Sequence, residues 1–254
     1  MKNILVIITL LWLSASCSFS QDNRPDASDK INQTDSQGRK QGYWEEVDGT
    51  VKSVGFYVND QKDGSWLTYH PTGIVQFLES YRNGKKDGAF IEIDSRGSFI
   101  SEQFYYNDKK HGAYRVYERS RLILEENYVN DNLQGQKRAY YSNGTLQEES
   151  IYKDGIKNGI SKWYGQSGSL VAEYTYVDGK FEGIQKTFYD TGTLMSEESF
   201  SDNVRNGLHK DYHPSGVVKA EGNYKANLKD GIWREYDENG NLTGEITFTE
   251  GTEK

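Results

Sequence analysis

The sequence predicts an all-β fold, an elongated antiparallel β-meander of about nine hairpin units of 24 residues. Three observations predict it: a glycine that recurs every 22 to 24 residues, short extended segments between turn-forming residues, and no helical periodicity. In such an array each unit packs mainly on its neighbours, so we expect a twisted single sheet or a coiled ribbon. The repeat glycines are Gly42, Gly64, Gly88, Gly112, Gly135, Gly159, Gly183, Gly207 and Gly231.

Residues 1–20 have the features of a signal peptide. Lys2 precedes an apolar run over residues 4–13 that is too short to span a bilayer, and small residues follow it. The alternative is that this run forms a buried first helix of the fold. The signal-peptide interpretation predicts that the protein is exported to the periplasm or secreted.

Two cleavage patterns compete at the end of this segment. Ser18 and Ser20 suit an ordinary signal peptidase, which would leave Gln21 as the new N-terminus. Residues 14–17, SASC, resemble instead a lipoprotein box in which Cys17 carries the lipid. The second pattern predicts an outer-membrane lipoprotein, with the lipid on Cys17 as the protein's sole membrane contact.

The mature chain divides into a linker, an array and a tail. Residues 21–38 are polar, contain no aromatic residue, and predict a flexible linker. The repeat units fill residues 39–250, and residues 251–254 are a short tail. Cys17 is the sole cysteine, so no intramolecular disulfide can form and packing must hold the array together.

The charge of the chain bears on its partners. The formal net charge is −8, and removal of residues 1–20 takes away Lys2 and no acidic residue, which gives −9. An acidic protein of this kind is disfavoured as a partner of nucleic acids and of anionic membrane surfaces. We therefore expect a protein partner.

Each unit can be counted from its repeat glycine as position zero. Positions 2, 5 and 17 are aromatic in most units, and turn-forming segments such as HPTG, YSNG and DENG end in a second glycine at position 9. Asn-Gly or Asp-Gly pairs follow position 17 in several units, and they are a strong hairpin signal because both residues tolerate positive φ. Each unit is therefore strand, turn, strand, turn, and about eighteen strands are expected. The repeat glycine itself is expected in left-handed or bulge geometry.

Two positions of the unit carry opposite charges. Position 3 is basic in six successive units, and position 14 is glutamate in six units. Carboxylates on alternate strands would lie about 9–10 Å apart, a spacing that also suits the paired acids of a glycosidase. Two regular rows of opposite sign favour cross-strand charge pairing over catalysis and over an acidic ligand-binding row.

No catalytic or metal-binding pattern stands out. His70 and His213 occupy equivalent turn positions before proline, and His209 shares one strand face with His213 in the predicted strand. Neither the spacing of these histidines nor any nucleophile or phosphate-binding motif favours a site. We expect no catalytic residue, no metal and no cofactor.

The repeat resembles a known family. Segments such as DGSWLTYHPTGIVQFLESYRNGKKDG and DGIWREYDENGNLTGEITF are similar to the MORN repeat (membrane occupation and recognition nexus) in its bacterial variant, over about residues 38–250. The resemblance implies an all-β array of hairpins with a scaffolding role in protein–protein contact. Bacterial proteins with this variant are often named YwqK-like antitoxins.

The expected function is that of an exported, non-enzymatic scaffold. The alternatives are an antitoxin or immunity-type inhibitor of a partner toxin, and a module that binds glycans of the cell envelope. Aromatic rows could face any of these partners. The candidate partner-facing residues are Trp44, Trp66, Tyr69, Trp163, Tyr212 and Trp233.

Overall fold

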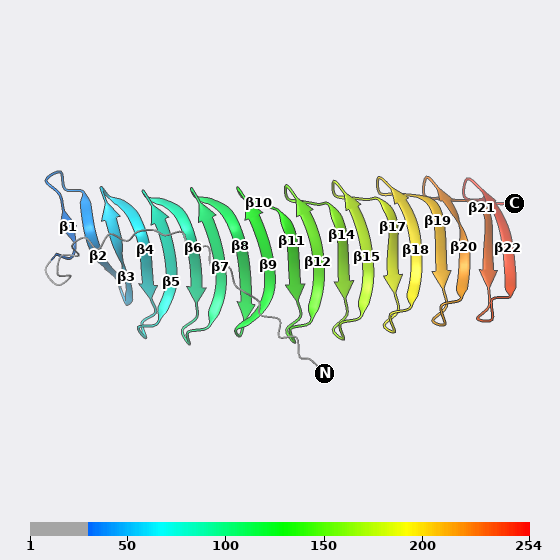
Figure 1. The fold of residues 1–254 in the computed structure, drawn as a ribbon, viewed down its shortest axis with the longest axis horizontal. Coiled ribbons are helices and arrows are strands. Elements are labelled where there is room, and N and C mark those ends of the chain that lie inside the picture. The colour runs from blue at the N-terminus through cyan, green and yellow to red at the C-terminus, as the bar shows by residue number, and fades with distance from the viewer. Residues whose placement is uncertain (1–29) are drawn as a thin grey trace, which may run out of the picture.

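The computed structural model describes residues 30–254 as one open sheet of antiparallel strands, which confirms the predicted all-β hairpin array. The strands lie side by side in chain order, from β1 at the blue end to β22 at the red end (Figure 1). Within residues 30–254 there are 23 strands and no helix. Consequently no helix in this part of the chain could cross a membrane.

Eighteen strands are long, as expected, and five have two residues. The long strands are β2 (Lys40–Asp48), β3 (Val51–Val58), β4 (Gln61–Tyr69), β5 (Val75–Arg82), β6 (Lys85–Ile93), β7 (Phe99–Tyr106), β8 (Lys109–Glu118), β9 (Arg121–Val129), β11 (Gly135–Tyr140), β12 (Leu146–Lys153), β14 (Gly159–Tyr164), β15 (Leu170–Val177), β17 (Gly183–Phe188), β18 (Leu194–Ser201), β19 (Val204–Tyr212), β20 (Val218–Lys225), β21 (Leu228–Tyr236) and β22 (Leu242–Thr249). The short ones are β1 (Gln33–Thr34), β10 (Asn132–Leu133), β13 (Ile156–Lys157), β16 (Lys180–Phe181) and β23 (Thr252–Glu253).

All nine repeat glycines have positive φ, between 71° and 118°. The ladder register shifts beside them: Glu79 lies opposite Phe90 and Tyr81 opposite Lys86, so the segment around Gly88 contains extra residues. Glycine is favoured here because a side chain at positive φ is strained. The expected left-handed or bulge geometry is confirmed, and the glycines serve backbone conformation.

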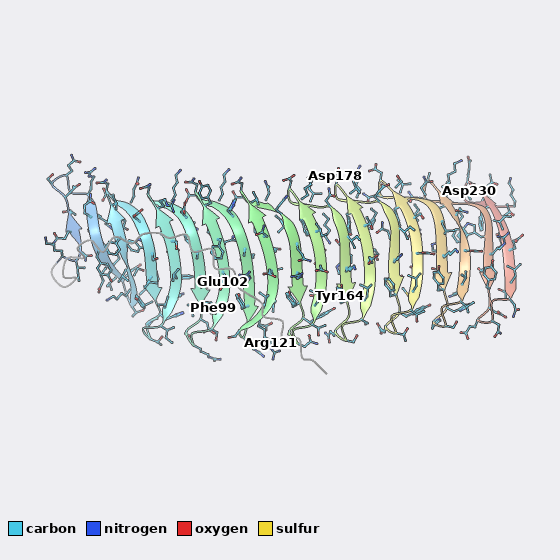
Figure 2. All side chains as sticks on the ribbon, viewed as in Figure 1. Phe99, Glu102, Arg121, Tyr164, Asp178 and Asp230 are labelled. Carbon is cyan, nitrogen blue, oxygen red and sulfur yellow. The ribbon has the colours of Figure 1, made fainter. Side chains whose placement is uncertain are left out.

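Two rows of turns run along the two long edges of the array. Asp178 and Asp230 lie toward one edge and Arg121 toward the other (Figure 2). At the first edge, side chains of one turn bind the previous unit, as when the Lys86 amide donates to Asp108 Oδ1 at 2.8 Å. At the other edge the Tyr141 hydroxyl donates to the carbonyl of Tyr164 at 2.9 Å. These bonds join consecutive units beyond the strand ladders.

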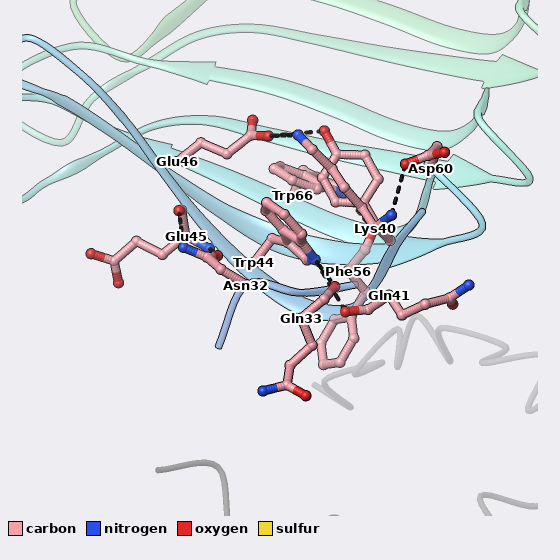
Figure 3. Close-up of polar contacts among 11 residues, drawn as sticks. Asn32, Gln33, Lys40, Gln41, Trp44, Glu45, Glu46, Phe56, Asp60 and Trp66 are labelled. Carbon is pink, nitrogen blue, oxygen red and sulfur yellow. Dashed lines mark hydrogen bonds and ion pairs between the residues drawn. The ribbon is translucent and has the colours of Figure 1, made fainter. Parts of the chain in front are cut away.

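The first strand closes the N-terminal edge of the sheet. Gln33 and Thr34 pair with Gln41 and Lys40 of β2, and the Asn32 side chain bonds both the amide and the carbonyl of Glu45 (Figure 3). Residues 32–34, which fall within the linker expected over residues 21–38, thus bind the array. An open edge strand leaves backbone groups without hydrogen-bond partners, and residues 32–34 supply such partners to β2.

Burial occurs within a single layer. The buried hydrophobic residues among those described are Val54, Tyr57, Trp66, Ala172 and Trp233. Trp66 is 1% exposed because its indole lies across Gly55 of the neighbouring strand, where a Cβ would overlap the ring. Trp233 covers Gly222 in the same way. Rings that cover neighbouring backbone thus replace the second layer of an ordinary sandwich.

Candidate functional site

The two faces of the sheet carry different side chains, because successive residues of a strand point to opposite sides. We call one the aromatic face; it carries Trp66, Phe90, Tyr105, Trp163 and Trp233 together with a row of lysines. We call the other the ladder face; it carries one row of alternating charges across β7 to β22.

The ladder face confirms the predicted cross-strand charge pairing. Arg115 lies opposite both Glu102 and Glu125, and its Nε is 2.9 Å from Glu125 Oε1. Lys186 lies opposite Glu173 and Glu197, although no ion pair within 4.0 Å forms there. The full row is Glu102, Arg115, Glu125, Arg138, Glu149, Lys162, Glu173, Lys186, Glu197, Lys210, Glu221, Arg234 and Glu245.

Tyrosines at position 5 belong to the ladder face. The Tyr212 hydroxyl donates to Glu197 Oε1 at 2.7 Å, and the Tyr236 hydroxyl donates to Glu221 at 2.9 Å. Burial, together with the bond to Glu197, raises the pKa of Tyr212 to about 12. These hydroxyls therefore stay protonated at neutral pH and act as donors to the ladder.

On the aromatic face, cations and rings alternate. Lys62 Nζ lies 4.3 Å from the Trp66 ring centroid, and Lys229 Nζ lies 4.1 Å from that of Trp233. Lys40 lies 4.6 Å from both Trp44 and Tyr57, and Figure 3 shows its ammonium beside Glu46. Cation–π contacts of this kind hold the rings and the lysine stems in one arrangement.

The six candidate partner-facing aromatics do not form one surface. Trp66 and Trp233 are buried on the aromatic face, where Trp44 and Trp163 are half-buried. Tyr212 lies on the ladder face against Glu197, and Tyr69 shares that face with Lys52, its neighbour in the ladder. Whether any of the six contacts a partner stays a prediction.

Carboxylates of the aromatic face, buried as in Glu126 or half-buried as in Glu148, contact cations of the same face. Glu148 Oε1 accepts from Ser150 Oγ at 2.7 Å and from Lys157 Nζ at 3.0 Å. Burial alone would raise the pKa of Glu148, but these two bonds outweigh it and leave the pKa below its ordinary value. Glu126 Oε1 lies 3.7 Å from Lys137 Nζ.

A hollow of about 310 Å³ opens on the aromatic face over β5 to β8. Rings of Phe77, Phe90, Tyr105 and Tyr114 line it together with polar side chains. One of these, Gln103, is 6% exposed, and its Oε1 has no hydrogen-bond partner. A hollow with ring walls and an unused acceptor is suited to binding a donor group.

Three of the four histidines make contacts within the array. His70 and His213 bond the carbonyls of Ile93 and Tyr236 through Nε2, both at 2.9 Å, at equivalent turns. His209 lies on the aromatic face between Tyr224 and Trp233, with Nε2 3.2 Å from Asp211 Oδ2. Residues 30–254 contain no group of three or more His, Cys, Asp or Glu side chains that could hold a metal. The candidate lipidation site, Cys17, lies outside the described residues.

Comparison with known proteins identifies the repeat. The family model described as a MORN repeat variant matches residues 62–83, 133–154, 157–178, 181–202, 205–226 and 229–250, which together make up just over half of the chain. Each match spans nearly one unit. The units over residues 84–132, which include the short unit at Gly112, have no match.

Other comparisons add little. No curated protein matches the chain. Among solved structures, the crystal structure of a mutant of S. aureus TarM in complex with fondaparinux, alpha-GlcNAc-glycerol and UDP is similar at 14% identity, with a TM-score of 0.27. The match covers 42% of this chain and 21% of that one, so the chain spans about a fifth of the length of TarM.

Proposed function

Since the chain belongs to the MORN repeat variant family, whose repeats are non-enzymatic modules for protein or membrane interaction, we propose that it is an exported scaffold that binds a protein partner through its aromatic face. The observation that carries this proposal is the hollow over β5 to β8, which combines ring walls with a buried amide oxygen, Gln103 Oε1, that has no partner within the array.

The ladder face is less suited to specific binding. Its charges alternate along the row, seven glutamates against six basic residues, so the face presents little net field to a partner. Exposed ion pairs of this kind also contribute little energy. The aromatic face, in contrast, has rings already held by lysines, and a surface that is ordered before binding loses little entropy on association.

Affinity capture from the native envelope tests this proposal. The mature protein is the bait, with Phe77→Ala as the variant of the aromatic face and Phe104→Ala as the matched control on the ladder face of a nearby strand. We expect a partner to be captured by the wild type and by Phe104→Ala, and to be lost or depleted with Phe77→Ala. Circular dichroism confirms that each bait is folded. If capture is lost with Phe104→Ala and unchanged with Phe77→Ala, the partner binds the ladder face and the proposal is wrong.

Export is proposed from residues 1–20 and has its own test. The intact mass of the native protein should correspond to loss of the first 16 residues with lipid on Cys17, or loss of the first 20 without lipid. A protein of full-length mass in the cytoplasm contradicts export.

Inhibition of a partner toxin, as in YwqK-like antitoxins, would be one form of protein binding, and a toxin as the captured protein would establish it. Binding to envelope glycans is the other alternative. A glycan array probed with the mature protein tests it directly, and specific binding there would redirect the proposal.

A further inference from the structure

We propose that the hollow over β5 to β8 is a receptor for one arginine side chain of the partner protein, held by Glu79, Glu92 and Gln103 between aromatic walls. The proposal rests on the proposed function of the aromatic face and names the chemistry that this face recognises. It follows from which carboxylates of the aromatic face have a cation within the chain and which do not, since Glu79 is bonded by the Tyr81 hydroxyl but by no cation.

The lining of the hollow is rich in acceptors that lack a cation. Glu79 and Glu92 both line it, and neither has a basic side chain within 4.0 Å among the described residues. Gln103 lies opposite Phe90 in the ladder, and its Nε2 is used by the carbonyl of Phe104 at 2.8 Å, so its Oε1 is the free end of the amide. A buried acceptor without a donor costs free energy, which a ligand that donates would recover.

Three equivalent carboxylates elsewhere on the aromatic face have a cation. Glu126 and Glu198 occupy the place in their units that Glu79 occupies in its own; they lie 3.7 Å from Lys137 and 2.9 Å from Arg205. Glu46 corresponds to Glu92 and lies 2.7 Å from Lys40. These three carboxylates thus have a cation, whereas Glu235, which also corresponds to Glu92, has none within 4.0 Å. At the hollow the contact is missing for both Glu79 and Glu92.

The lysines nearest the hollow are engaged with rings. Lys86 Nζ lies 4.9 Å from the centroids of Phe90 and Tyr105, and Lys110 Nζ lies 5.4 and 5.0 Å from those of Tyr114 and Tyr128. Lys110 also lines the hollow, so the lining carries two carboxylates against one ammonium. The balance of charge at the hollow therefore favours a cation.

Arginine fits this lining better than lysine does. A guanidinium is planar, stacks on aromatic rings and offers five donors, whereas an ammonium is compact and strongly hydrated. Two carboxylates and one amide oxygen can accept from separate edges of the guanidinium. A hollow of about 310 Å³ has room for the apolar stem of the side chain as well as its head.

Calorimetric titration of the full mature protein tests the proposal, with N-acetyl-arginine amide as the probe. N-acetyl-citrulline amide is the neutral isostere and N-acetyl-lysine amide the second cation. We expect saturable binding of one arginine amide, weaker binding of the lysine amide, and an affinity for the citrulline amide lower by about tenfold or more, since hydrogen bonds to charged groups are stronger.

Three variants locate the site. Glu79→Gln and Glu92→Gln should each weaken arginine binding several-fold, and the matched control Glu198→Gln, whose carboxylate already contacts Arg205, should leave it unchanged. The proposal is overturned if no saturable binding is seen or if the citrulline amide binds with equal affinity. It is also overturned if neither Glu79→Gln nor Glu92→Gln changes the affinity for the arginine amide. If arginine amide binds as expected but no partner protein is captured, the receptor stands and the proposed function fails.

Discussion

Replacing Gly222 by alanine tests how a single layer of strands buries its rings. The backbone at Gly222 is not in the left-handed region, so alanine is permitted there. Its Cβ, however, would overlap the indole of Trp233, which lies across this residue. The indole must then move away from the Tyr224 ring, whose centroid is 5.1 Å from its own, and from Lys229 Nζ, which lies 4.1 Å from its centroid.

The cost can be bounded from the burial of the ring. Trp233 is 8% exposed, and an aromatic side chain buries about 150–250 Å², worth about 4–6 kcal/mol if the ring were wholly expelled. Overpacking usually costs about 1–3 kcal/mol, because neighbours adjust. We expect Gly222→Ala to lower the free energy of unfolding by about 2–4 kcal/mol, between these limits.

Urea unfolding followed by circular dichroism measures this change, and Gly244→Ala is the matched control. Gly244 lies two strands away on the same face, also outside the left-handed region, and its Cβ would come no closer than 3.6 Å to Glu235. The control should change stability by less than about 0.5 kcal/mol. In a Trp233→Ala background, Gly222→Ala should cost almost nothing, because the overlap is gone. Equal effects of Gly222→Ala and Gly244→Ala would refute the reasoning.

Three further predictions concern the array. Lys186→Glu should lower the free energy of unfolding in urea by at most about 1 kcal/mol, and adding Glu197→Lys should restore part of that loss. A double-mutant cycle without coupling would contradict charge pairing between these two residues. Deletion of residues 159–182 removes one whole unit in register, and this variant should be folded and show a cooperative thermal melt. A 12-residue deletion, which removes half a unit, should aggregate. Similar thermal melts of the two variants would contradict a modular array. Hydrogen bonds from Arg39 lower the pKa of Asp35 to about 2, so its contribution to the N-terminal turn is full above its ordinary pKa and lost as pH falls toward 2. The protection factors of amide hydrogen exchange in this turn should fall only in that acid range.

The regular features of the fold were predictable from the sequence because each is local. The period of the repeat glycines, the hairpin turns and the paired charge rows depend on residue identity and spacing, and all three are confirmed. The division of aromatics between two faces was missed, because a bulge after position 4 changes which neighbours Tyr212 meets. The lysine two residues before many repeat glycines, as in Lys62 and Lys229, was an available signal for the cation–π rows.

Other features could not be predicted because they depend on what surrounds a residue. Residues 32–34 bind β2 because an edge strand has backbone groups without partners. The composition of these residues does not reveal that pairing. The hollow lies where Glu79 and Glu92 lack a cation of the kind that Glu46, Glu126 and Glu198 have. Such a mismatch appears only when register and side-chain contacts are known together.

Site-specific photo-cross-linking in the native envelope tests most directly whether the aromatic face binds the partner. A photoreactive phenylalanine replaces Phe77 on the aromatic face in one strain and Phe104 on the ladder face in another. We predict a covalent adduct with a second protein from position 77 and none from position 104. An adduct from position 104 alone, or from neither position, would contradict the account.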